Sequence, residues 1–277
     1  MFDLHVHAAP DVTARIGYDD QICTEYERAG FNGFVLKSHH ESTVGRAAAL
    51  DRRSTLDVVG GVALNRSVGG INPAAVVAAL ASGGRVVWFP TADSHTQQSA
   101  GLPRLRDVDP RLDPDSLSLP PFVADDGIVA NNARHILDLI RDYDAVLCTG
   151  HVSRRECAWL LAEARARGIS RVLLTHPSYT VPGMSPTEIA ELAEGGAFVE
   201  ITAFQLWHQP GMTTETLAEV ARAAGPMLVL ASDAGQPNSP PPPEALLRLV
   251  EALAGEGIDA AALAAGSDET PRTLVLR

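Results

Sequence analysis

The regular alternation of short apolar segments with helical segments is the strongest constraint on how this 277-residue chain folds. Eight segments are short, apolar and rich in β-branched residues, which is typical of strands buried on both faces. They are residues 2–7, 33–38, 57–64, 85–89, 145–149, 171–175, 197–202 and 227–232. Eight strand–helix units predict an α/β protein with one closed (β/α)8, TIM-like barrel over residues 1–277.

Local signals support the helices between these strands. Ser153 with Glu156, and Ser185 with Glu188, have the spacing of capping boxes, in which each side chain bonds the backbone N–H of the other residue. An open doubly wound sheet is the alternative fold. It typically has a glycine-rich first turn, whereas the first turn here is Ala8-Ala9-Pro10-Asp11, so the closed barrel is favoured.

A long insertion interrupts the alternation after the fourth predicted strand. Residues 90–130 are rich in proline, aspartate and serine and show no helical period. Loops of this length are usually functional or disordered. We expect a lid over the barrel mouth, with residues 122–129 forming a hairpin whose turn is Asp126-Gly127; a surface loop without function is the alternative.

Composition restricts the class of partner. The formal net charge is −12, which repels a nucleic-acid backbone, and no apolar run of membrane-spanning length occurs. The N-terminus shows no signal-peptide pattern, and the three cysteines show no C-x-x-C spacing, so we expect a reducing, cytoplasmic location. These features favour a small-molecule partner, and chains of this size often form homo-oligomers.

The first predicted strand carries an H-x-H motif. Side chains alternate along a strand, so Asp3, His5 and His7 should share one face, with Phe2 and Leu4 on the other. Two imidazoles two residues apart on one face can converge on a transition-metal ion such as zinc or iron. This motif is common by itself, so the residues at the ends of the other strands must show whether it belongs to a metal site.

Polar residues gather where the predicted strands end. Chemistry in such barrels lies at the carboxyl ends of the strands, which meet at one mouth. Six of the nine histidines fall there, and an aspartate follows the eighth strand: His5, His7, His39, His40, His151, His176 and Asp233. The convergence of these residues predicts a metal site.

Lys37 follows the second strand and is the only lysine among 22 basic residues. Arginine cannot replace the tunable pKa and nucleophilic amine of lysine, so we predict catalytic roles for Lys37 and for His39, which shares its face. The alternative for Lys37 is an internal ion pair with Asp3 or Glu200.

The set His5, His7, His151, His176 and Asp233 resembles the metal site of the amidohydrolase superfamily. This resemblance implies one or two divalent ions, zinc first and manganese or iron as alternatives, bound by these five residues. It implies that metal-activated water attacks an amide, lactone or ester. Asp233 would both bind the metal and transfer the proton.

The fourth strand departs from that family. Binuclear members have a bridging carboxylated lysine or glutamate there, whereas this chain has Val87-Trp88-Phe89-Pro90-Thr91. Three explanations remain open: a mononuclear site, as in some deaminases and decarboxylases of the superfamily, a bridge or cation from Lys37, or a contribution from Glu200.

A weaker resemblance connects the chain to the polymerase and histidinol phosphatase (PHP) group. His39 matches a metal-binding histidine of that group, and Ser232-Asp233-Ala234-Gly235 is similar to its final motif. Ser38 and Gly235 stand where two ligands of that group would be expected, so the match to its three-metal site is incomplete. On the residues that do match, a phosphoesterase is an alternative function. A mononuclear-metal decarboxylase and a non-catalytic small-molecule sensor are the others.

Residues for substrate recognition are less clearly marked. Arg66 and Asn65 lie in a glycine-containing loop that could bind an anion, and Glu200 lies on the seventh strand. We predict substrate contacts for these three, and the sequence does not name the substrate.

Overall fold

The computed structural model describes residues 1–103, 111, 119, 121–122 and 127–276. Its eight strands pair in parallel in chain order, and backbone bonds from His7 N to Ala234 O (2.9 Å) and from Asp233 N to His5 O (2.8 Å) join the last strand to the first. The predicted barrel is thereby confirmed, and the open sheet is wrong. The strands are β1 (Phe2–Val6), β2 (Gly33–Leu36), β3 (Asp57–Ala63), β4 (Val86–Trp88), β5 (Val146–Cys148), β6 (Val172–Leu174), β7 (Phe198–Thr202) and β8 (Leu228–Ala231).

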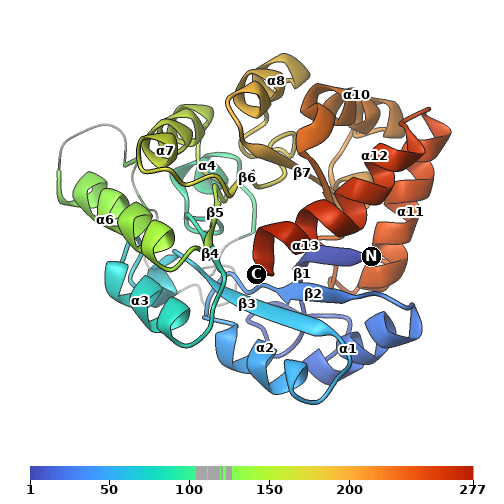
Figure 1. Ribbon diagram of the computed structural model, residues 1–277, viewed down its shortest axis with the longest axis horizontal. Coiled ribbons are helices and arrows are strands. Elements are labelled where there is room, and N and C mark those ends of the chain that lie inside the picture. The colour runs from blue at the N-terminus through green and yellow to red at the C-terminus, as the bar shows by residue number, and fades with distance from the viewer. Residues whose placement is uncertain (104–110, 112–118, 120, 123–126, 277) are drawn as a thin grey trace.

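Helices surround this barrel (Figure 1). Ser153 and Ser185 each accept a bond from the backbone of the glutamate three residues on, so both predicted capping boxes are confirmed. The helices are α1 (Asp19–Arg28), α2 (Val44–Asp51), α3 (Pro73–Ala81), α4 (His95–Ser99), α6 (Ile128–Asp142), α7 (Arg154–Ala166), α8 (Pro186–Glu194), α9 (Phe204–His208), α10 (Thr214–Ala224), α11 (Pro242–Gly255), α12 (Ala260–Ala264) and α13 (Thr270–Val275).

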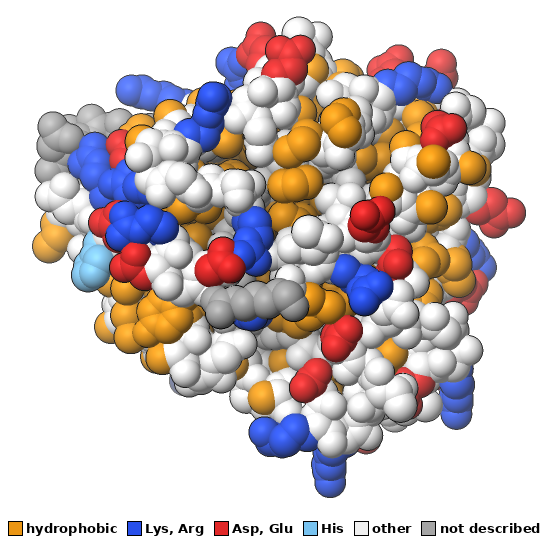
Figure 2. All heavy atoms as spheres, in the orientation of Figure 1, with side chains coloured by type: hydrophobic (Ala, Val, Ile, Leu, Met, Phe, Trp, Pro, Cys, Tyr) orange, Lys and Arg blue, Asp and Glu red, His pale blue; other side chains and the backbone are white. Residues whose placement is uncertain are grey.

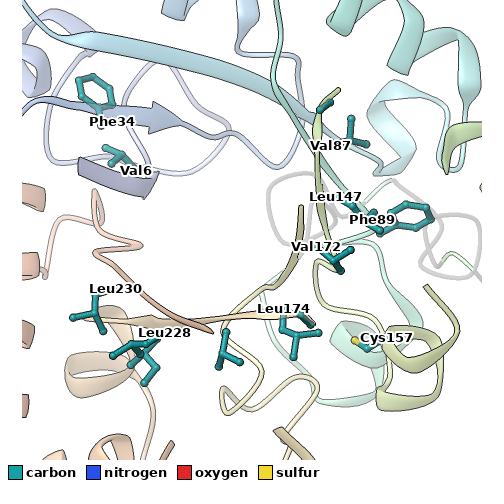
Figure 3. Packing of buried hydrophobic residues seen from close by; sticks show 14 of the residues in the cluster. Val6, Phe34, Val87, Phe89, Leu147, Cys157, Val172, Leu174, Leu228 and Leu230 are labelled. Atoms are coloured by element: carbon teal, nitrogen blue, oxygen red, sulfur yellow. The ribbon is translucent and has the colours of Figure 1, made fainter. Parts of the chain in front are cut away.

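The apolar core forms two layers. One layer packs strand residues such as Val6, Phe34 and Leu230 against the helices (Figure 3). The other consists of strand residues and α13 only, and it includes Leu4 and Trp88, so it fills the barrel interior. α13 lies across one end of the barrel (Figure 1), which leaves the opposite, carboxyl end for the site.

A bulge in β1 changes the predicted alternation. Asp3 pairs with Phe34 and Val6 with Leu36, so β1 contains one residue more than β2 over this stretch. Leu4 and His5 therefore both point into the barrel, whereas Asp3 points outward. The prediction that Asp3 shares a face with His5 is wrong, because a bulge interrupts the two-residue period.

The insertion after β4 differs from its prediction in two places. The short helix α4 occurs where no helical period was evident. Ile128 and Val129 begin α6 rather than a strand, because α6 continues a helical run that buries Ala133, Ile136 and Ile140. The predicted turn of the hairpin lies partly outside the described residues, as do residues 104–110, 112–118, 120 and 123–126 of the predicted lid.

The surface is mixed in charge. Figure 2 shows acidic and basic side chains interspersed on the face that α13 covers. All three cysteines are free and buried. Among the described helices, none combines the length and apolar composition needed to cross a bilayer.

Candidate metal centre

The structure brings the predicted metal ligands together at the carboxyl end of the barrel. Nε2 of His5 lies 3.1 Å, and Nε2 of His7 lies 3.3 Å, from Oδ1 of Asp233. The ring centroids of His151 and His176 are 4.9 Å apart, and that of His176 lies 5.8 Å from that of His5. These five side chains are buried together; His5, His7 and Asp233 are close enough to share one ion, as are His5, His176 and Glu200, and His151 adjoins His176.

Glu200 orients His5. Nδ1 of His5 lies 3.2 and 3.3 Å from the two carboxylate oxygens of Glu200, so Nδ1 carries the proton and donates it. The lone pair of Nε2 then lies beside both Asp233 and the ammonium of Lys37. A carboxylate behind the imidazole is the usual means of fixing a metal-binding tautomer, so Glu200 serves as a positioning residue here.

Three buried ring nitrogens lack partners within the described part of the chain. Two belong to this cluster, Nε2 of His151 and Nδ1 of His176, and the third is Nδ1 of His40. Nδ1 of His151 donates to Oε1 of Gln97 (3.0 Å), so its Nε2 holds a free lone pair. Burying an unpaired polar atom costs about 1–3 kcal/mol, so a bound group is expected here. The donors, imidazoles with one carboxylate, fit a zinc, manganese or iron ion.

The raised pKa values of the two buried carboxyl groups indicate that their ionised forms need additional positive charge nearby. Burial raises the pKa of Asp233 to about 8, despite the opposing effect of the Lys37 cation. Burial also raises the pKa of Glu200. Burial lowers the pKa of His5, His7 and His151 well below the ordinary value, and that of His176 to about 3. Neutral imidazoles beside carboxylates that need a cation form a suitable pocket for a divalent ion.

Lys37 lies within this cluster. Its Nζ donates to Nε2 of His5 at 2.9 Å and lies 5.6 Å from the ring centroid of Trp88. Burial lowers its pKa. The alternative ion pair with Asp3 is wrong, because the bulge directs Asp3 to the opposite face, where it accepts a bond from the Tyr26 hydroxyl (2.6 Å).

Of the remaining predicted residues, His39 lies beside the histidine cluster, whereas Asn65 and Arg66 lie away from the cavity. His39 stacks on His7, with centroids 5.1 Å apart, and its Nδ1 bonds Oγ1 of Thr91. Asn65 is buried and braces the loops after β2 and β4, donating to His39 O (2.7 Å) and accepting from Thr91 N (3.0 Å). Neither Asn65 nor Arg66 is among the described residues that line the cavity.

A cavity of about 300 Å³ opens above the cluster. Its volume suits a small molecule. Two of its wall residues, Gln97 and Phe204, lie in segments from which specificity was expected, the insertion 90–130 and the loop 204–208. Sequence reasoning missed Arg15, Tyr179 and Gln236.

Solved structures share this architecture at low sequence identity. One is 5-methylcytosine deaminase from Klebsiella pneumoniae, with a TM-score of 0.60 and 13% identity over 92% of this chain. This chain covers only 62% of that protein. An amidohydrolase from Pseudomonas aeruginosa matches with 0.61 and 13%, covering 98% of this chain and 95% of its own. Organophosphorus hydrolase from Deinococcus radiodurans matches with 0.61 and 12%, covering 99% and 91%.

The chain therefore shares the closed-barrel fold of these structures, and the predicted resemblance to the amidohydrolase superfamily is confirmed at the level of the fold. Within that fold, the chain belongs to the family of unknown function DUF6282, whose model matches residues 1–200. The matched region contains every residue discussed as a ligand except Asp233. No curated protein matches the sequence.

Proposed function

We propose that this protein is a metal-dependent hydrolase that acts on an amide, lactone or ester of a small molecule. The observation that carries the proposal is the pair of unpartnered nitrogens on His151 and His176, buried beside His5, His7 and Asp233 within the described chain. These five residues would hold a divalent ion, with zinc as the first choice and manganese or iron as alternatives.

The charges favour one ion rather than two. Asp233 and Glu200 are the carboxylates in contact with the described histidine cluster, and Lys37 already supplies one cation. β4 ends at Trp88 and contributes no carboxylate to bridge a second ion. One divalent ion brings the formal charge of these groups to +1, whereas two would bring it to +3 in a buried space.

The chain's own residues define the proton path. A divalent ion in this position lowers the pKa of bound water to about 7 and polarises a substrate carbonyl. Asp233 faces the ligand nitrogens of His5 and His7, so its carboxylate can accept the proton of the attacking water and pass it to the leaving group. Lys37 would stabilise negative charge that develops there, and His39, which lines the cavity, would contact the substrate.

One lyase alternative is favoured by a specific observation. Because β4 provides no bridge, the site matches the mononuclear arrangement expected for a decarboxylase. Release of carbon dioxide from an aromatic acid, without hydrolysis of esters or lactones, would support it. The phosphoesterase alternative is less favoured, since a Cβ at Gly235 would lie 2.0 Å from His7 O and no side-chain ligand can stand there.

Metal analysis tests the proposal. Protein purified without chelators and then exposed to zinc or manganese should retain about one ion per chain. His5→Ala should lose the ion and hydrolysis of aryl esters and lactones, whereas His135→Ala on the exposed face of α6 should keep both. Wild-type protein that takes up no ion would contradict the proposal, and unchanged activity in His5→Ala would favour a sensor.

A further inference from the structure

Arg15 is a buried cation on the cavity wall that the proposed chemistry does not use. It lies in the loop between β1 and α1, and this loop is held in place by backbone bonds from Ile16 N to Gly235 O (2.7 Å) and from Ala9 N to Gly17 O (2.8 Å). Its side chain is 5% exposed, and that of its partner Asp11 is 1% exposed. The backbone is therefore anchored, and the guanidinium lies inside the mouth.

The contacts of Arg15 determine which ring nitrogen of His7 carries the proton. Nε and Nη2 of Arg15 lie 2.8 and 2.7 Å from Oδ2 of Asp11, and Nη2 lies 3.2 Å from Nδ1 of His7. A guanidinium can only donate hydrogen bonds, so Nδ1 of His7 must accept. A neutral imidazole that accepts at Nδ1 carries its proton on Nε2, which faces Asp233.

This arrangement conflicts with metal binding at His7. The nitrogen of His7 nearest Asp233 is Nε2, and a ligand nitrogen must offer a lone pair, so the proton must move to Nδ1. An N–H at Nδ1 would then point at the N–H of Arg15. The tautomer of His5 needs no such change, because a carboxylate faces its Nδ1, although Lys37 must move away from its Nε2 when an ion binds there. Loading of the ion must therefore detach Arg15 from His7.

We propose that Arg15 is the residue that binds an oxyanion of the substrate, and that binding of the ion at His7 releases it for this role. This inference rests on the proposed function and names a substrate class for it. Within the described chain, Nη1 of Arg15 makes no hydrogen bond, and release of Nη2 from His7 frees a second donor for a bidentate contact. Tyr179 and Phe204 give the same cavity an aromatic wall. The expected substrate is a small apolar or aromatic compound that carries a carboxylate.

Zinc affinity tests the release, without any need for catalysis. Arg15→Gln should bind zinc about ten-fold more tightly than wild type, because no hydrogen bond to His7 has to be broken. Arg15→Lys keeps the charge but lacks the planar fork, and should resemble Arg15→Gln. Arg155→Gln, exposed on α7, is the control for loss of one positive charge and should match wild type. Competition with a chromophoric chelator measures each affinity.

Anion binding tests the role in recognition. Phenylacetate should bind the zinc-loaded wild type and, by linkage, should tighten its zinc binding. The neutral amide phenylacetamide should do neither, and phenylphosphonate tests whether a phosphorus oxyanion is preferred. In Arg15→Gln the effect of phenylacetate should fall at least ten-fold.

The outcomes separate the two proposals. Phenylacetate binding that is unchanged in Arg15→Gln, or zinc affinities that are equal in wild type and both Arg15 variants, would overturn the role of Arg15 while leaving the metal site intact. Failure of every variant to bind zinc would overturn the proposed function and the inference that rests on it.

Discussion

At the scale of single residues, Lys37 connects the chemistry of the site to its charge. Its ammonium contacts the same nitrogen of His5 that faces Asp233. A cationic lysine beside one ion and a carboxylated lysine bridging two ions make different demands on this position. The side chain is 1% exposed, so its substitution must preserve volume to be informative.

Lys37→Met tests which of these two roles applies. For a mononuclear site we expect the variant to retain about one zinc per chain while activity falls about 100-fold or more, since the methionine fills the volume without the charge. Metal analysis and steady-state kinetics on the same preparation measure both quantities. Loss of metal together with activity would instead indicate that Lys37 carries a bridging carboxylate.

At the scale of the element, the bulge in β1 determines where His5 points. Asp3 holds the bulge by accepting bonds from His5 N (3.1 Å) and Ser232 N (3.0 Å), and from the hydroxyl of Tyr26 on α1 (2.6 Å). Burial raises the pKa of Asp3 to about 6. This outward side chain therefore connects β1, β8 and α1, and it positions the first metal-binding histidine without contacting the site.

Comparison of Asp3→Ala with Tyr26→Phe should distinguish the effect of the bulge from the effect of the contact with α1. Asp3→Ala leaves two backbone N–H groups unpaired, so we expect a loss of about 1–3 kcal/mol in the free energy of unfolding and weaker zinc binding, because His5 is no longer held inward. Tyr26→Phe removes only the hydroxyl bond and should lower stability while zinc affinity stays near wild type. Urea denaturation and chelator competition give the two values; equal zinc affinity in Asp3→Ala would refute the positioning role.

At the scale of the whole molecule, the buried ionisable groups predict how stability depends on pH after metal removal. Histidines whose folded pKa is lowered bind protons only in the unfolded chain below pH 6.5, so stability falls as the pH falls, by about 1.4 kcal/mol per unit for each proton. Asp233, with a folded pKa of about 8, acts in the opposite sense, and its contribution is lost as the pH rises through 8. The most deeply buried of these histidines are His5, His7, His39, His151 and His176, and the pKa values of His40 and His208 are lowered by burial in the same direction.

Chelator-treated protein should therefore be most stable near pH 6.5. Urea denaturation across pH 4.5–8.5 should show loss on both sides, with the acid side steeper because more groups act there. Asp233→Asn should remove much of the alkaline loss. A stability that keeps rising to pH 8.5 in the wild type would contradict these pKa directions.

Much of the fold and part of the site follow from local sequence. Capping at Ser153 and Ser185 depends on residues three apart, and the eight strands are recognisable because both of their faces are apolar. The positions of His151, His176 and Asp233 after successive strands predict a common mouth, because parallel strands in a closed barrel end on one side. These features depend only on neighbours in sequence and on the topology that the alternation implies.

The tertiary structure alone decided which atoms meet. The bulge that directs His5 inward depends on the register of β1 against β2, and the contact of Arg15 with His7 depends on a loop anchored to Gly235, far away in sequence. Asn65, whose predicted contact with substrate stays a prediction, braces two loops that are distant in sequence. The alternation and spacing of residues do not predict these contacts. Their partners lie far apart in sequence and meet only when the chain folds.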